Sequence, residues 1–192
     1  MKIKVASGDI TEYTADAILI NLFEGDTKPT GTTGIVNTAL NDAIYKLISS
    51  GEITGKQGEI TRIHTLGLMN PDRVVVIGLG KQHDLDIDKI RSVVGSTCRY
   101  LRRLNVKTIA TVAHGMGVGD INAQASAQAI AEGALLGLYE FDKYISNDDL
   151  KSKTPSHVPF NSDDISAIFS KLYFICSFLG SNFNWRDSSS DR

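Results

Sequence analysis

The sequence predicts an α/β fold, a three-layer α/β/α arrangement around a mixed, largely parallel sheet. Two observations predict it. Nearly continuous apolar runs at 16–23, 72–80 and 107–113 are typical of strands that are covered on both faces. Segments with apolar residues at helical spacing lie between these runs, and strands joined through helices pair in parallel with right-handed crossovers.

The first half of the chain is predicted to begin with two strands and a helix. Residues 2–7 alternate apolar and polar side chains, which indicates a half-buried strand, and 16–23 form the second strand. The composition of 27–34 predicts a loop. From Ile35 the apolar period becomes helical, and Gly51 ends the predicted helix.

A pair of strands and a second helix follow. Residues 58–66 and 72–80 are predicted strands joined by a turn at Asn70 and Pro71. The second of these strands is the most apolar, so we expect it at the centre of the sheet. A helix is then predicted from about Asp86, with apolar residues at helical spacing as far as Leu104.

Residues 107–113 are the last predicted strand, and a helix follows from about Asn122 to Tyr144. Gly133 and Gly137 lower its helix propensity, and we expect them to let its backbone approach the sheet closely. The predicted order is therefore β-β-α-β-β-α-β-α over residues 1–145.

The character of the chain changes after residue 145. Residues 146–192 are rich in serine, with several Asp and Asn residues. We interpret 146–162 as a linker and 165–180 as a candidate amphipathic helix, because its apolar residues fall on one helical stripe. The predicted organisation is one domain over 1–145, followed by a linker and tail over 146–192.

Composition and charge exclude several classes of protein. The chain has 192 residues, of which 42% are hydrophobic, and its 20 basic and 22 acidic residues give a net charge of −2. There is no basic excess for binding nucleic acid or an anionic membrane. The first residues do not resemble a secretory signal, and Cys98 and Cys176 form no paired motif. We expect a reduced, cytoplasmic protein that binds neither nucleic acid nor membranes.

No catalytic or metal-ligating residue is predicted. Asp84, Asp86 and Asp88 alternate but lack the glycine and glutamate of a calcium loop, so we interpret them as a solvated turn before a helix. Neither cysteine has a catalytic context, and no nucleophile elbow is present. The histidines are scattered and include no metal-binding motif: His64, His83, His114 and His157.

Glycine loops give a weaker signal for a phosphate site. GLGK at 78–81 follows a strand but lacks the spacing of a phosphate-binding loop. Gly115, Gly117 and Gly119 follow the strand 107–113 and precede a helix, where backbone amides could hold a phosphate. The alternative is an ordinary strand-to-helix turn.

The opening IKVASGDITEYTADAILIN resembles the start of macro domains. That resemblance implies an ADP-ribose site in which Asp9 and Ile10 face the adenine and Asn21 lies near the distal ribose. Thr32 and Thr33 stand where macro domains usually carry a run of glycines.

A second resemblance covers about residues 1–145. GKQGEI at 55–60, VVVIGLGK at 74–81, the helix start at Ile90-Arg91 and AEGALLGLYEFDKY at 131–144 resemble the amino-terminal, macro-like domain of the leucine aminopeptidase (cytosol aminopeptidase) family. The resemblance implies a larger second domain in that family, which binds two divalent cations, zinc or manganese, and removes N-terminal residues from peptides. The family's metal-binding motifs do not occur in this sequence.

Two interpretations remain from the sequence. The first is a non-catalytic assembly or regulatory domain of a leucyl aminopeptidase that is truncated before the two-metal catalytic domain. Its partners would be that catalytic domain or neighbouring subunits. Whether such a chain has enzymatic activity stays open. The alternative is a stand-alone macro-type module that binds ADP-ribose or a related nucleotide. A small hydrolase without a recognisable motif is a third option. The ligand-binding residues of the alternative would be Asp9, Ile10, Asn21, Gly115, Gly117 and Gly119.

Overall fold

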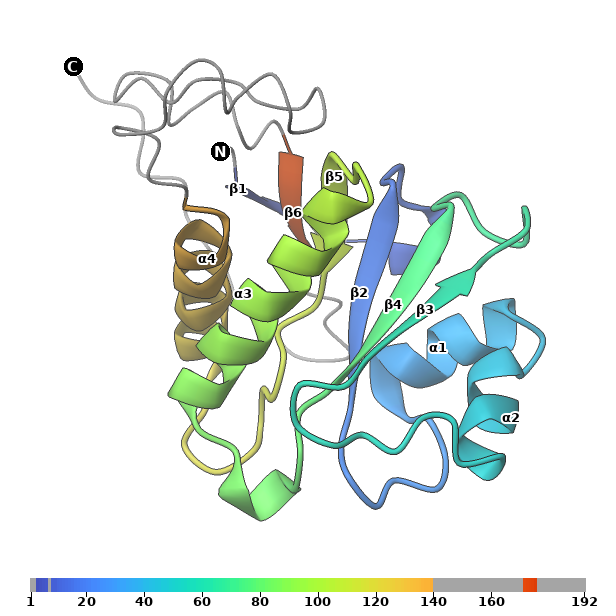
Figure 1. Ribbon diagram of the computed structural model, residues 1–192, viewed down its shortest axis with the longest axis horizontal. Coiled ribbons are helices and arrows are strands. Elements are labelled where there is room, and N and C mark those ends of the chain that lie inside the picture. The colour runs from blue at the N-terminus through green and yellow to red at the C-terminus, as the bar shows by residue number, and fades with distance from the viewer. Residues whose placement is uncertain (1–2, 7, 140–170, 176–192) are drawn as a thin grey trace, which may run out of the picture.

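A six-stranded sheet runs through the molecule in the order β1-β6-β5-β2-β4-β3 (Figure 1). The computed structural model describes residues 3–6, 8–139 and 171–175. Neighbouring strands pair in parallel except β3 with β4, so the prediction of a mixed, largely parallel sheet is confirmed. The strands are β1 (Ile3–Ala6), β2 (Ala17–Leu22), β3 (Ile60–His64), β4 (Arg73–Gly78), β5 (Thr108–Thr111) and β6 (Lys171–Ile175).

Helices cover both faces of the sheet, which makes the three predicted layers (Figure 1). The helices α1 (Gly31–Ala39) and α2 (Ala43–Ser49) lie on one face, and α3 (Ile87–Arg103) and α4 (Ala123–Leu138) lie on the other. Alternate residues of β2 enter the two cores: Ile18 and Ile20 pack with α1 and α2, whereas Ala17 and Leu19 pack with α3 and α4. Burial on both sides explains the continuous apolar run of this strand.

The sixth strand differs from the prediction. The sequence favours an amphipathic helix over 165–180, but Lys171–Ile175 form β6, which pairs in parallel with β1 and with β5. This segment, KLYFI, is rich in residues that favour strands, and hydrogen-bonding partners on both sides outweigh its helical spacing. The sheet thus extends beyond the predicted boundary at residue 145. The rest of 165–180 and the predicted linker 146–162 lie outside the described residues.

The strand β4 is not at the centre of the sheet as predicted. It is second from the edge, between β2 and the antiparallel β3, while β5 and β2 occupy the middle. Its residues from Val74 to Gly78 are nevertheless buried. Helices on both faces bury a strand whatever its place in the sheet, so an apolar run does not identify the central strand.

The first helical region is divided in two, where the sequence predicts one helix from Ile35. The helix α1 begins at Gly31, within the predicted loop 27–34. It ends before Asn41 and Asp42, whose φ angles of 53° and 61° are left-handed. The side chain of Asn37 stabilises this break, because its Nδ2 donates to Asp42 Oδ1 at 2.7 Å and its Oδ1 accepts from the Tyr45 amide at 2.9 Å.

The two long helices begin where the sequence predicts. The carboxylate of Asp86 accepts from the Lys89 amide at 2.7 Å, and Asn122 Oδ1 accepts from the Ala125 amide at 2.8 Å. Both residues are N-caps, which satisfy amides that have no partner inside the helix. The helix α4 ends at Leu138, and the predicted continuation over 140–144 lies outside the described residues.

Glycines allow the backbones of α3 and α4 to pack closely against each other. A Cβ atom at Gly133 would overlap the carbonyl oxygen of Arg91, and one at Gly137 would overlap the carbonyl oxygen of Gly95. A Cβ atom at Gly95 would in turn lie 2.9 Å from the carbonyl oxygen of Gly133. The prediction that Gly133 and Gly137 approach the sheet is therefore wrong, because the surface they approach is the backbone of α3.

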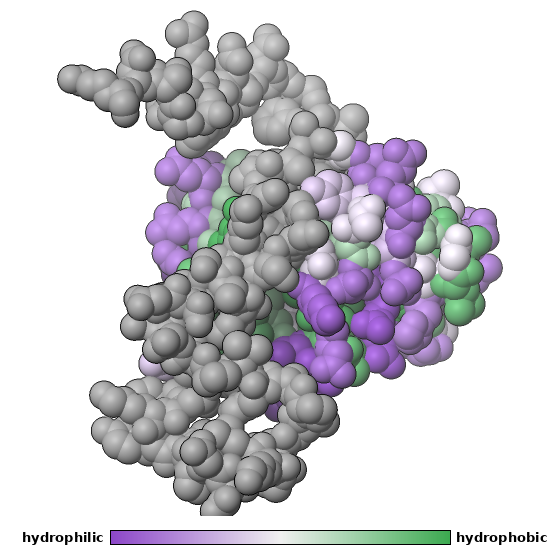
Figure 2. Space-filling model, turned by 90° about the horizontal axis from the view of Figure 1, so that it is seen from above, coloured by the Kyte–Doolittle hydropathy of each residue, from purple (hydrophilic) through white to green (hydrophobic). Residues whose placement is uncertain are grey.

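The part of the surface that is seen in Figure 2 and not drawn in grey is mostly polar. Figure 2 shows hydrophilic residues over much of the end seen from above, with smaller hydrophobic groups among them. Two short 3-10 turns, η1 (Ile10–Glu12) and η2 (Gln82–Asp84), complete the described elements. Within the described residues, no helix has the length and apolar character needed to cross a bilayer.

We predict that Gly137→Ala destabilises the domain. Alanine has the higher helix propensity, by about 1 kcal/mol, but overpacking against a backbone carbonyl costs about 1–3 kcal/mol, so the clash decides the sign. Urea unfolding measures the change. Gln124→Ala, at an exposed position of the same helix, is the control and should change the free energy of unfolding by less than about 0.5 kcal/mol. A Gly137→Ala protein as stable as this control would contradict the close packing.

Candidate functional site: a pocket at the carboxyl ends of two central strands

Two of the glycine motifs found in the sequence build the fold near β4 and form no phosphate cradle. A Cβ atom at Gly78 would overlap the Lys56 carbonyl, so the 55–58 loop can lie directly on β4. The Glu59 carboxylate holds that loop by accepting from the amides of Thr54 and Gly55 at 2.9 and 2.7 Å. These contacts give GKQGEI and GLGK a structural role.

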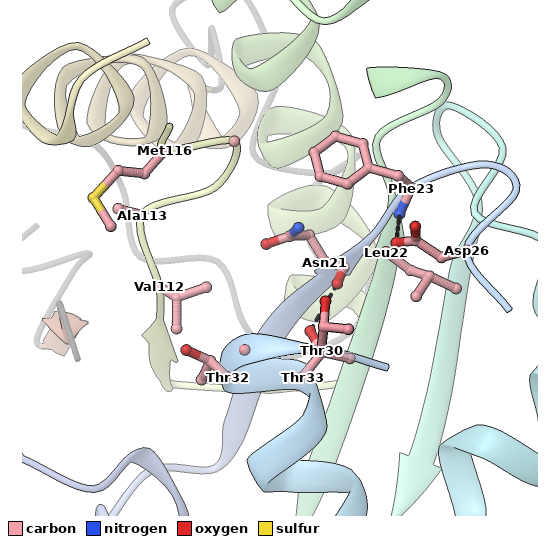
Figure 3. A pocket seen from close by; sticks show the side chains of 12 residues that line it. Asn21, Leu22, Phe23, Asp26, Thr30, Thr32, Thr33, Val112, Ala113 and Met116 are labelled. Atoms are coloured by element: carbon pink, nitrogen blue, oxygen red, sulfur yellow. Dashed lines mark hydrogen bonds between the residues drawn. The ribbon is translucent and has the colours of Figure 1, made fainter. Parts of the chain in front are cut away.

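A pocket of about 240 Å³ lies where β2 and β5 end (Figure 3). The chain leaves β2 toward α1 on one face of the sheet and leaves β5 toward α4 on the other. Such a switch point leaves a crevice at the carboxyl ends of the strands. The described residues that line the pocket are Asn21, Leu22, Phe23, Asp26, Thr30, Gly31, Thr32, Thr33, Val112, Ala113, Gly115 and Met116.

A buried histidine connects the two strands behind the pocket. His114 is fully buried, with its Nε2 2.8 Å from Thr111 Oγ1 and its Nδ1 3.0 Å from Asn21 Oδ1. A carboxamide oxygen can only accept, so Nδ1 carries the proton and the Thr111 hydroxyl donates to Nε2. Burial lowers the pKa of His114 from 6.5 to about 3. The ring is therefore neutral at physiological pH.

This arrangement fixes the orientation of Asn21. Its Oδ1 accepts from His114, and its backbone carbonyl accepts from Thr33 Oγ1 at 2.8 Å (Figure 3). The Asn21 Nδ2 group is consequently left as a donor at the pocket wall. The nearby first turn of α1 adds backbone amides without intrahelical partners, and the N-cap Thr30 makes no side-chain capping bond.

Asp26 adds a negatively charged hydrogen-bond acceptor to the pocket, in contrast to the Asn21 amide donor. Its Oδ2 accepts from the Phe23 amide at 3.1 Å, which holds the turn after β2 in place. Among the described lining residues, Asp26 is the only charged side chain. The pocket therefore combines an acidic acceptor, an amide donor and apolar walls.

The residues predicted for a nucleotide site do not all lie together. Asn21 and Gly115 line the pocket, but Ile10 is only 1% exposed and packs in the core with α1. The Asp9 carboxylate caps η1 by accepting from the Thr11 amide at 2.9 Å. Gly117 donates its amide to Ile121, and Gly119 lines a separate surface hollow with His83 and Leu85.

The ionisable groups of the described residues do not form a metal centre. Within the described residues, no group of three or more His, Cys, Asp and Glu side chains could hold a metal ion. The family resemblance implies the pair of cations for the second domain. The Cys98 thiol is buried, and its desolvation raises its pKa to about 12, which keeps it protonated. Asp86 is an N-cap, in agreement with the predicted turn before a helix.

Sequence reasoning missed His114, Thr111 and Asp26 as members of this site. A usable signal exists for His114: it directly follows the apolar run 107–113, and Asn21 lies near the end of the apolar run 16–23. The carboxyl ends of parallel strands meet at one edge of a sheet. Asp26 carries no comparable pattern.

Residues 19–148 match the model of the cytosol aminopeptidase family, N-terminal domain. The chain belongs to the cytosol aminopeptidase family. A relative described as a probable cytosol aminopeptidase, from Alkaliphilus oremlandii, is 35% identical over 148 residues, which are 77% of this chain and 30% of that protein. The chain thus spans about a third of the length of the curated relatives it matches.

Solved structures show the same fold. A tomato leucine aminopeptidase mutant aligns with a TM-score of 0.63 and 18% identity, over 94% of this chain and 33% of that one. A Trypanosoma brucei macrodomain, solved in complex with ADP-ribose, also gives a TM-score of 0.63, with 13% identity over 91% of this chain and 63% of that one. The cytosol aminopeptidase N-terminal domain therefore has the macrodomain-like fold that both sequence resemblances imply.

We predict that His114 makes stability fall with acidification. The pKa of His114 is lowered in the folded state, so below about pH 6.5 the unfolded chain binds a proton that the native state excludes. The free energy of unfolding therefore falls by about 1.4 kcal/mol for each further pH unit until about pH 3. Urea unfolding between about pH 7.5 and pH 5.5 measures this slope. His114→Gln removes the titrating ring and should show a shallower slope. Equal slopes in the two proteins would contradict the buried neutral imidazole.

Proposed function

We propose that this domain serves as a non-catalytic assembly domain, which docks on the catalytic part of a metal-dependent aminopeptidase in the cytoplasm. The match of residues 19–148 to the family's N-terminal domain carries the proposal. The described ionisable groups are consistent with it, because His114 is buried between two partners and Cys98 is held as a neutral thiol.

The end of α4 offers a surface for such docking. Leu136 is 72% exposed and Tyr139 is 59% exposed, and Leu135 adds a third large apolar side chain to the same turns. Exposed apolar groups that gather on one element are typical of interaction sites. The close packing of α4 against α3 sets the position of this surface relative to the sheet.

Co-purification with a catalytic segment tests the docking. We expect this chain to bind the remaining, carboxy-terminal part of the Alkaliphilus oremlandii relative when the two are co-expressed, and Leu136→Asp to weaken the association at least about tenfold. Leu66→Asp is the matched control, because Leu66 is 89% exposed on the β3–β4 turn. Absence of association, or equal effects of the two substitutions, would contradict docking through α4.

Activity assays separate the non-catalytic role from a hidden hydrolase. The chain alone, supplied with Mn²⁺, is expected to release no product from a leucyl chromogenic substrate, since its described residues provide no cluster of metal ligands. Turnover by the isolated chain that disappears after an Asp-to-Asn substitution within it would instead establish a catalytic domain.

The macro-type alternative rests on the pocket and on the fold shared with the Trypanosoma brucei macrodomain. We expect no saturable heat when ADP-ribose is titrated into this chain. The Asp26 carboxylate opposes a pyrophosphate, and neither Lys nor Arg is among the described lining residues. Saturable binding that is lost in Asn21→Ala would overturn this expectation and favour the nucleotide module.

A further inference from the structure

We propose that the pocket at the ends of β2 and β5 binds a free α-amino acid with an apolar side chain, in its zwitterionic form. The argument starts from size. Its volume of about 240 Å³ lies below the range of about 300–1,000 Å³ that is usual for drug-sized ligands. A single small metabolite therefore suits it better than a dinucleotide.

The charge of the pocket selects the ammonium end. Asp26 is the only charged side chain among the described lining residues, and its Oδ1 is not used in the bond that its Oδ2 makes with the Phe23 amide. A carboxylate at the wall of a partly enclosed site attracts an ammonium group and disfavours a ligand with net negative charge.

The amide of Asn21 selects the carboxylate end. His114 and Thr33 fix Asn21 through its side-chain and backbone oxygens, so the Nδ2 donor is preorganised rather than free to turn. A fixed donor loses little entropy when it binds an acceptor. The first turn of α1, at Gly31 and Thr33, reinforces the positive potential on this side of the pocket.

Apolar side chains complete the recognition. Leu22 and Val112 are buried at the strand ends, and Met116 extends over the other side from the loop after β5 (Figure 3). Methionine adapts to ligands of different shape, and at 43% exposure Met116 lies at the rim. Leucine, valine or methionine would match these walls better than a polar amino acid.

Free amino acids are the class of molecule that an aminopeptidase releases, so occupation of this pocket would make the domain a sensor of product. This sensor role rests on the proposed function. Binding itself does not, because it needs only the chain described here. The two proposals can therefore fail separately: docking is read by co-purification, and the pocket is read by titration of the isolated chain.

Calorimetric titration of the full chain with L-leucine tests the proposal. We expect saturable binding, with leucinamide, which lacks the carboxylate, and 4-methylpentanoate, which lacks the ammonium group, each at least about tenfold weaker. Asp26→Asn should weaken leucine binding by about tenfold, whereas Glu24→Gln, an exposed acidic residue outside the pocket, should not change it.

Three results would overturn the proposal: no saturable heat with L-leucine, equal affinity for leucine and leucinamide, or equal affinity of the Asp26→Asn and Glu24→Gln proteins. The ligand series uses the unmodified chain, so it decides the question even where a substituted protein fails to fold.

Discussion

The hydrogen-bonded chain from Thr111 through His114 to Asn21 is the contact on which the pocket depends. It joins the ends of β5 and β2, because the bond from His114 to Asn21 links residues that are 93 positions apart in sequence. Both ring nitrogens have partners, so the buried imidazole leaves no polar atom unsatisfied. Ser126 Oγ donates to the His114 carbonyl at 2.8 Å and extends the connection into α4.

This constraint supports the proposal that the site binds a ligand. A histidine held neutral between a hydroxyl and an amide oxygen is shielded from any substrate, whereas the Asn21 amide it orients reaches the pocket. The same link through Ser126 places α4, with its exposed apolar end, in a fixed relation to the pocket. The proposed recognition of a small ligand and the proposed docking of a larger partner would thus use two ends of one hydrogen-bonded unit.

Much of the architecture could be predicted because burial leaves a local pattern. Strands covered on both faces give continuous apolar runs, and N-caps such as Asp86 and Asn122 mark the starts of helices. The strand β6 was not predictable, because its helical spacing and its strand propensity point in opposite directions and pairing with β1 and β5 decides between them. Likewise, the sequence does not tell whether Gly137 faces a sheet or a helix.

The site was predictable only in part. Asn21 follows from the resemblance to macro domains and Gly115 from the glycine loop after an apolar strand, and both line the pocket. The place of His114 after an apolar strand is visible in the sequence, but its contact with Asn21, 93 positions away, is seen only in the fold. Asp26 lines the pocket only because the turn after β2 places it there, so its position in the sequence does not predict its place in the site.

The protonation state of His114 tests the central claim most directly. Nitrogen-15 NMR of the folded chain distinguishes the two neutral tautomers and the imidazolium ion. A ring that stays neutral with its proton on Nδ1 from neutral pH down to about pH 5 is the predicted result. Titration near the ordinary value, or a proton on Nε2, would contradict the account of how Asn21 is held.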